Sequence, residues 1–430
     1  MRSLLVALLI FGSLPVIIVK PHVGVLVWSW IGYMNPHRLT WGFAYDFSFA
    51  LVVGLVTIAA WLFSREPKTL PRHPLVLLLA AFAVWVSFTT LFAVYPDHAQ
   101  WKWDRTIKIL LFNGFVTLGL ITTRERLDAL IWVIVLSLGF FAIKGAAFTL
   151  LTGGNYRLWG PPGSFLEDNN ALGLALLMAI PLVRYLQLTA RRRGVRLGLL
   201  FAIPCFLVAV LGTYSRGAVV GLGVTVVALA LKSRHRMSLA LIAGIALAGA
   251  VQFMPEHWHA RIASIATYEE DASAQARFQS WGYALEVARD SPILGGGFEI
   301  FRGNQTATSA GYRSAHSIYF ETLAEHGYPG LVIFLALGIG AYMTAWSITR
   351  RARDHPELAW AADLAAMVQV GIAAYASAGL FLNLATFDLY YHLVAIVVIA
   401  SALVRQRLAS GAPTEMAVSP AYARPSDARA

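Results

Sequence analysis

The sequence predicts an all-α polytopic integral membrane protein with about twelve transmembrane helices and one large extracytoplasmic loop. Of its 430 residues, 58% are hydrophobic and only 13% are charged, whereas soluble domains average roughly 45–50% apolar and about 25% charged residues. The mean hydropathy of +0.62 points the same way. Apolar runs of about 20 residues, the length that crosses a bilayer as a helix, recur along the chain. One long polar stretch, 254–327, interrupts them.

The apolar runs give the order of the predicted spans. The first run follows Met1 and Arg2 and resembles a signal peptide, but no A-x-A-like cleavage site follows it, so we expect it to remain as the first helix. A shorter apolar piece, 23–34, is rich in Trp, Tyr and Gly and is predicted to be re-entrant or interfacial. The predicted spans are 3–19, 43–64, 73–94, 107–122, 128–151, 170–189, 196–213, 217–232, 237–253, 328–349, 359–381 and 386–404.

Basic residues between the spans set the predicted orientation. The formal net charge of +11 could suggest nucleic acid, but much of it lies in short clusters in alternate loops. By the positive-inside rule, these loops and both termini are cytoplasmic, so no nucleic acid partner is needed to explain the charge. The clusters are Arg65/Lys68/Arg72, Arg124/Arg126, Arg191–Arg193/Arg196, Lys232/Arg234/Arg236, Arg350/Arg351/Arg353 and Arg405/Arg407.

This orientation divides the chain into four predicted segments. Residues 1–253 form about nine spans, and the polar stretch 254–327 is an extracytoplasmic loop with short helices. Residues 328–404 form three further spans, and 405–430 form a disordered cytoplasmic tail rich in Ala, Pro, Ser and Arg. A polar loop of this length between spans is where function is usually found. The single cysteine, Cys205, lies in an apolar run, so no intrachain disulfide is possible.

Arg216 is the first candidate functional residue, in the turn Tyr214-Ser215-Arg216-Gly217. This turn joins two predicted spans on the outer side, where an arginine runs against the positive-inside bias. An ionisable residue at membrane depth is a functional candidate by default, and the guanidinium fork suits a phosphate or pyrophosphate group. The alternative is an arginine that anchors a helix end by snorkelling.

Two more candidates lie within the long outer loop. Arg277 and Trp281 begin a short amphipathic pattern that ends near Asp290, and Arg277 could act as a second anion clamp or simply face solvent. His316 could take a proton from a hydroxyl nucleophile, because its pKa ordinarily lies near neutrality, or could be a satisfied interfacial histidine. Gly327 is expected to end the helical segment that contains Tyr319 and Glu325.

A third group is predicted to form a basic, aromatic rim. Lys102 and Arg105 alternate with tryptophans in the predicted outer loop 95–106. Aromatic rings stack on sugars and cations attract phosphates, so the rim suits a glycolipid, although an interfacial belt explains it equally well. Asn169 belongs to a polar stretch, 163–170, that is predicted to cap the next span and face the site.

Several expected signatures of other functions are missing from the sequence. There is no Walker A motif, which argues against ATP-driven transport. There is no D-x-D carboxylate pair in the predicted outer loops, and the acidic cluster 269–271 is better explained as a solvated turn than as a metal site. We therefore predict no metal and no cofactor.

Taken together, these motifs resemble the O-antigen ligase family of polytopic membrane glycosyltransferases. The resemblance covers about residues 40–400 and depends on the order and spacing of motifs rather than on any single one. The N-terminal stretch from Pro21 to Arg38 also resembles O-glycosylation ligases associated with the exosortase A system. The matching residues are Gly163, Phe165 and Asn169, then Ser215-Arg216-Gly217, Arg277 and Trp281, Pro292 to Phe298, and finally His316, Ser317, Tyr319, Glu325 and Gly327.

The resemblance implies a GT-C-like, metal-independent, inverting enzyme of the bacterial inner membrane with a periplasmic active site. It would transfer a glycan from undecaprenyl pyrophosphate to the lipid A–core of lipopolysaccharide. Arg216 and Arg277 would hold the pyrophosphate, and His316 would activate the acceptor. The other expected substrate-binding residues are Lys102, Arg105, Asn169, Tyr214, Ser215, Trp281, Tyr319 and Glu325.

Two departures from the family pattern bear on the acceptor. Ser317 follows His316 where asparagine is common, and an Asn-Pro-Asn-like block is here Glu167-Asp168-Asn169-Asn170. The acceptor could therefore also be a protein hydroxyl or a growing glycan, as in a protein O-oligosaccharyltransferase or an O-antigen polymerase. A polyprenyl-glycan transporter is the third alternative, but it should carry charges at mid-membrane, whereas the candidates here gather at the outer face.

Overall fold

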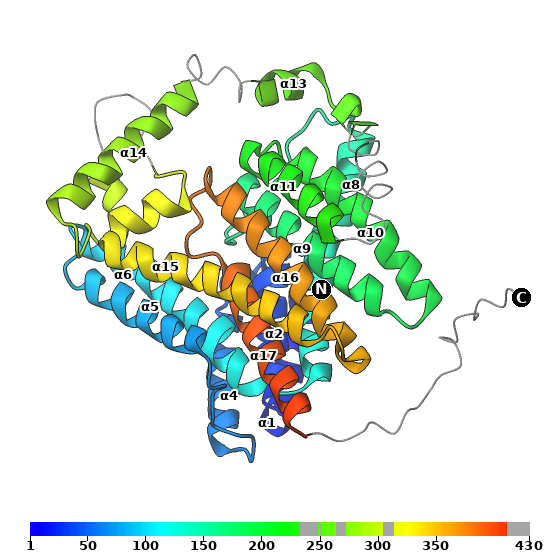
Figure 1. Cartoon of the computed structure of the whole chain (residues 1–430). Helices are drawn as coiled ribbons and strands as arrows, with labels where there is room; N and C mark the ends of the chain where they lie inside the picture. The colour runs from blue at the N-terminus through cyan, green and yellow to red at the C-terminus, as the bar shows by residue number, and fades with distance from the viewer. Residues whose placement is uncertain (233–243, 245–247, 250, 264–271, 304–313, 411–430) are drawn as a thin grey trace, which may run out of the picture.

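The computed structural model describes residues 1–232, 244, 248–249, 251–263, 272–303 and 314–410, and these residues form helices and connecting segments without a strand (Figure 1). Seven of the described helices are long and apolar enough to cross a membrane, which confirms the polytopic class. The total of twelve stays a prediction, since most of the predicted span 237–253 lies outside the described residues. The seven are α1 (Arg2–Val19), α8 (Arg124–Leu151), α9 (Asn169–Thr189), α10 (Arg193–Gly212), α15 (Ile318–Arg351), α16 (Ala359–Gly379) with η4 (Pro356–Leu358), and α17 (Asp388–Ser410).

Helix α9 is the axis of the bundle. Its sequence is apolar on every face, and its residues from Ala171 to Val183 are all buried. A helix that is apolar all round is expected to be enclosed by others. Helices α8, α10, α16 and α11 (Arg216–Lys232) surround it.

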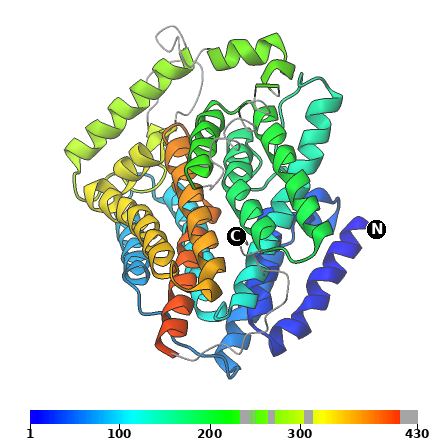
Figure 2. The same cartoon turned by 45° about the vertical axis from the view of Figure 1, so that its right-hand side comes forward.

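The N-terminal helices pack at one side of this bundle. Helix α1 lies at the margin, as Figure 2 shows, and contacts α2 (His22–Met34) and α4 (Phe49–Phe63). Helix α2 has 13 residues, or about 20 Å, which is too short to cross a hydrocarbon core of about 30 Å. It packs against α8, and its Tyr33 hydroxyl lies 2.6 Å from Nδ1 of His392 on α17. Between α2 and α4 lie η1 (Pro36–Leu39) and α3 (Phe43–Asp46).

The prediction that 95–106 form a loop is wrong, because residues 96–106 are helical. Their place on the outer side stays a prediction. After α5 (Pro74–Thr90), helix α6 (Pro96–Ile109) begins with a proline, whose missing N–H is harmless in the first turn. It continues into a π-helical segment, η2 (Leu110–Val116), and α7 (Thr117–Leu120). The predicted span 107–122 is thus the second half of a longer helical run.

The polar stretch contributes α13 (Glu256–Ala263), α14 (Ala272–Asp290) and η3 (Ile300–Gly303). In Figure 1, α13 and α14 lie at the top, beyond the ends of the bundle helices. The expected amphipathic helix around Arg277 is therefore confirmed as a helix ending at Asp290. The acidic cluster 269–271 lies outside the described residues, as does the tail from 411.

A glycine-rich turn attaches this outer layer to α15. The backbone N–H of Gly296 donates to the carbonyl oxygen of Ala324 at 2.8 Å, and that of Gly297 donates to Glu325 at 2.9 Å. Gly327 has φ +66°, and a Cβ there would lie 2.2 Å from the carbonyl oxygen of Ile293. The predicted helix break at Gly327 is therefore confirmed, and only glycine allows this contact.

The basic loops gather at the opposite end of the bundle. Arg126 forms an ion pair with Glu66 at 2.7 Å, and Nη2 of Arg405 donates to the carbonyl oxygen of Arg72 at 3.2 Å. These contacts join three of the predicted cytoplasmic clusters in one place. Which side of a membrane this end faces stays a prediction.

Candidate functional site

Three helices begin at one place, at the end of the bundle next to the outer layer. The Asn169 amide at the start of α9 donates to the carbonyl oxygen of Thr213, just before α11, at 2.7 Å. A Cβ on Gly217 of α11 would lie 3.2 Å from the carbonyl oxygen of Ala378, near the end of α16. A Cβ on Gly379 would lie 2.4 Å from Ile318, the first residue of α15. The first turns of α9, α11 and α15 therefore converge, and helix N-termini favour anions.

The turn that carries Arg216 is held from three directions. The Tyr214 hydroxyl donates to the carbonyl oxygen of Gly154 and lies 2.8 Å from Nε2 of His257. Nε of Arg261 on α13 donates to the Tyr214 carbonyl oxygen at 3.1 Å. Tyr214 itself has φ +60°, an uncommon conformation for a residue with a side chain.

These contacts define different roles for the three residues of the turn. Tyr214 and Ser215 are buried, so they shape the turn, whereas Arg216 is half-buried and opens helix α11. Arg216 therefore lies beside the first N–H groups of α11, and helix N-termini favour anions.

His316 lies in a strained position directly before α15. Its φ of +46° is uncommon for a residue other than glycine, and such strain is often found at functional sites. Nε1 of Trp281 donates to the carbonyl oxygen of the preceding residue, Ala315, at 2.9 Å. The Trp281 ring also stacks on Phe320, with centroids 4.9 Å apart and planes at 14°. Trp281 therefore fixes the segment that presents His316.

The surroundings of His316 keep its imidazole neutral. The side chain can be reached by solvent, yet protein atoms crowd it, and this burial lowers its pKa to about 4. The positive charge of Arg277 lowers the pKa further, and the carboxylate of Asp168 opposes this. Both charges therefore lie near the ring. The free ring nitrogen of a neutral histidine can accept a proton from a hydroxyl group.

Asp168 and Arg277 reach this place from different elements. The Asp168 carboxylate caps α9 by accepting the N–H of Asn170 at 2.8 Å, as expected for the polar stretch 163–170. Arg277 is half-buried on α14, which packs against α15. Asp168 was not predicted as a neighbour of His316, although its place as a helix cap beside Asn169 was a usable signal.

Lys102 does not lie on an exposed rim, as the sequence suggested. It is only 8% exposed, and its ammonium lies 2.7 Å from Glu321 and 2.7 Å from Glu325. Burial lowers the pKa of Lys102, but the two carboxylates raise it more, so that the net pKa lies above its usual value. Glu325 also accepts the N–H of Glu299 at 2.9 Å. Lys102 and Glu325 thus connect α6 to α15 inside the protein.

The two remaining predicted residues are Arg105 and Tyr319. Arg105 is half-buried, with its guanidinium carbon 5.8 Å from the Phe165 ring. The Tyr319 hydroxyl donates to the carbonyl oxygen of Ala376 on α16 at 2.9 Å, which leaves its ring as a wall of a cavity. That apolar cavity, of about 280 Å³, lies between α15, α16 and α17 and was not foreseen from the sequence.

Residues 197–335 match the family model described as O-Antigen ligase. This part of the chain, about a third of its length, is similar to the O-antigen ligase family. The matched segment includes Arg216, Arg277 and His316, which lie on three separate elements of the site. Residues 1–190 match a family of unknown function (DUF5935). No curated protein matches the chain. The exosortase-associated branch stays a prediction.

Proposed function

We propose that this protein transfers a glycan from undecaprenyl pyrophosphate to the lipid A–core of lipopolysaccharide on the periplasmic face of the inner membrane. The observation that carries the proposal is the place of His316, directly before α15 and near the charges of Arg277 and Asp168, where three helix N-termini meet. This arrangement supports a reaction in which an anion is held while a nearby hydroxyl loses its proton. The family match supports the same class of chemistry.

In the proposed reaction, His316 accepts the proton of the acceptor hydroxyl as its oxygen attacks the anomeric carbon of the donor. The bond between that carbon and the pyrophosphate oxygen breaks, and its electron pair leaves with the pyrophosphate. Arg216 and Arg277 stabilise the charge that develops on the leaving group, together with the N–H groups of the converging helices. Attack from the side opposite the leaving group inverts the anomeric centre.

The apolar cavity supports a lipid-linked donor. It begins at Ile318 and Tyr319, two and three residues after His316, and continues between α15 and α16. Exposed Leu335, Ile339 and Met343 line its outer part on α15. A polyprenyl chain placed there would keep its isoprene units in an apolar environment and its pyrophosphate at the helix N-termini. The cavity therefore suits the first isoprene units of the donor.

Filling this cavity should weaken donor use. Ala373 lines it from α16 and is half-buried, so Ala373→Phe places a ring in the proposed path of the chain. We expect KM for the polyprenyl donor to rise about tenfold, corresponding to roughly 1.4 kcal/mol, with little change in kcat. Ala336→Phe on α15 is the matched control, because Ala336 lies outside the cavity. Equal KM values for the two variants would remove the cavity from the donor path.

The lowered pKa of His316 predicts the pH dependence of transfer. Because the base form is neutral, its fraction stays near one above the pKa of about 4 and falls below it. The transfer rate at saturating substrates should therefore be constant from about pH 8 to about pH 5 and should fall about tenfold per unit below pH 4. A decline centred near pH 6.5, the value of an unperturbed histidine, would contradict this environment. Circular dichroism at each pH would show that the protein remains folded.

A transfer assay with purified protein tests the function directly. Undecaprenyl-pyrophosphate glycan is the donor, and lipid A–core, an acceptor protein and free donor-type glycan are offered in separate reactions containing EDTA. Transfer to lipid A–core in EDTA supports a metal-independent ligase. Transfer only to the protein or to the glycan would instead indicate an O-oligosaccharyltransferase or a polymerase. No turnover of the donor with any acceptor would reject the proposed activity.

A further inference from the structure

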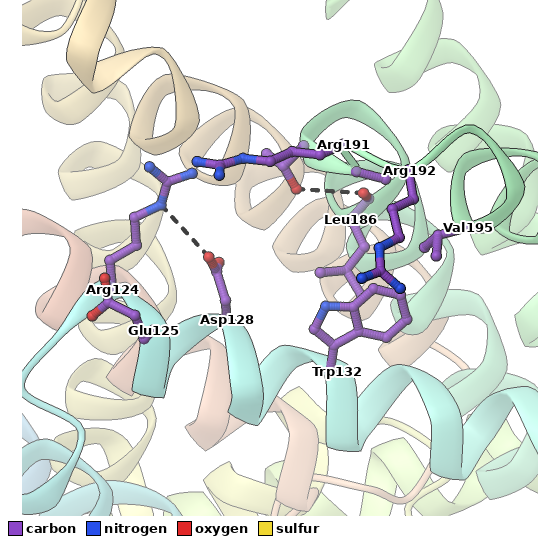
Figure 3. Close-up of a pocket in the computed structure, with 10 residues that line it drawn as sticks. Arg124, Glu125, Asp128, Trp132, Leu186, Arg191, Arg192 and Val195 are labelled. Atoms are coloured by element: carbon purple, nitrogen blue, oxygen red, sulfur yellow. Dashed lines mark hydrogen bonds and ion pairs between the residues drawn. The ribbon is translucent and has the colours of Figure 1, made fainter. Parts of the chain in front are cut away.

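A second cavity lies at the opposite end of the bundle from His316. Figure 3 shows the residues that line it. It has a volume of about 370 Å³, within the roughly 300–1,000 Å³ of small-molecule sites. Its walls are the first turns of α8, the last turn of α9 and the turn into α10. Helix α9 runs from Asn169 at the candidate site to Thr189 at this cavity, and its 21 residues span about 30 Å. That length matches a hydrocarbon core, so the cavity lies at the other membrane interface.

The acidic side chains that line this cavity are compensated within the protein, whereas two of its three arginines are not. Asp128 accepts the Tyr185 hydroxyl at 2.6 Å and lies 3.5 Å from Nε of Arg124. Glu125 lies in the first turn of α8, where the helix N-terminus stabilises its carboxylate. Both acids are therefore already compensated. The remaining charged groups of the cavity are Arg191 and Arg192, on the turn from α9 to α10.

Arg191 and Arg192 are exposed and unpaired. Neither side chain takes part in a hydrogen bond or an ion pair within the part of the chain that the structure describes, and Arg192 precedes α10 without a side-chain cap. The first N–H groups of α10 are therefore available to an acceptor. Two guanidinium groups beside an uncapped helix N-terminus form a site for an anion, and the guanidinium fork matches phosphate geometry.

The other side of the cavity is apolar and faces a lipid-exposed helix. Trp132 and Val195 line it, and Trp is common at membrane interfaces. Along α10, Leu197, Leu200 and Phe201 are 54%, 50% and 65% exposed, as expected for side chains that face acyl chains. We propose that this cavity binds the phosphate of an anionic phospholipid, with the acyl chains lying along α10. Basic pockets between transmembrane helices bind anionic head groups in this way.

Binding should depend on the two arginines and not on overall charge. The purified full-length chain in detergent is titrated with phosphatidylglycerol, and binding is measured by native mass spectrometry and by the shift in the unfolding temperature. Arg191→Gln/Arg192→Gln should weaken binding about thirtyfold, since each arginine near an anionic surface contributes to affinity. Arg65→Gln/Arg353→Gln removes the same charge from exposed positions outside the cavity and should leave affinity within about threefold.

Other ligands and one further variant test whether the cavity binds a phospholipid or only a free phosphate group. Phosphatidylcholine should bind more weakly than phosphatidylglycerol, and glycerol phosphate without acyl chains should give no comparable shift. Val195→Trp fills the apolar side without changing charge and should also reduce phosphatidylglycerol binding. Equal losses in both double-arginine variants would overturn the site, because they would reflect charge alone. An equal effect of glycerol phosphate would overturn the lipid as its occupant.

Discussion

Replacing His316 with asparagine should lower kcat for glycan transfer by about 10²–10⁴-fold, the range that general-base catalysis contributes. Asparagine is the informative substitution because it tolerates the positive φ of +46° at this position. The fold around residue 316 should therefore persist while the proton acceptor is lost. The measurement is the rate of glycan transfer at saturating donor and acceptor, with purified protein.

The donor affinity separates this role from a structural one. In the proposed reaction His316 acts on the acceptor, whereas Arg216 and Arg277 hold the pyrophosphate. The Kd for the polyprenyl donor should therefore stay within about threefold in His316→Asn. His98→Ala, an exposed histidine at the start of α6, is the matched control and should retain full activity. Unchanged kcat in His316→Asn would remove this residue as the base.

Most of the helices could be predicted because apolar run length alone determines whether a segment can cross a bilayer. Local chemistry also predicted particular features. The helix break at Gly327, the end of α14 at Asp290 and the cap on α9 each depend on residues within a few positions of one another. Such short-range signals do not need knowledge of the tertiary fold.

The environment of Lys102 could not be predicted in the same way. Its partners Glu321 and Glu325 are 219 and 223 positions away, so nothing near Lys102 in the sequence indicates that it is buried. The spacing of the two glutamates was a partial signal, since residues four apart share one face of a helix. The proximity of Asp168 to His316 likewise depends on how α9 and α15 each pack against α16. Long-range packing, rather than helix formation, therefore limited the prediction of the site.

The substitution Lys102→Met should destabilise the protein by about 3–5 kcal/mol, as breaking a buried ion pair does. Methionine fills much of the same volume but leaves Glu321 and Glu325 without their cation. Their side chains are only 2% and 3% exposed, so water cannot replace it. The free energy of unfolding would be measured in mixed micelles with increasing amounts of a denaturing detergent.

A compensated variant distinguishes the buried charge from simple loss of packing. In Lys102→Met/Glu321→Gln/Glu325→Gln, no charge remains in the cluster, and each glutamine oxygen can still accept the backbone N–H that its glutamate accepts, from Ala385 and Glu299 respectively. Most of the lost stability should therefore return, because uncompensated charge is the main cost. If the triple variant is as unstable as Lys102→Met, the ammonium acts through its own packing and hydrogen bonds. Since the cluster joins α6 to the segment of α15 that follows His316, recovered stability with recovered transfer would also assign Lys102 a structural role rather than contact with the donor.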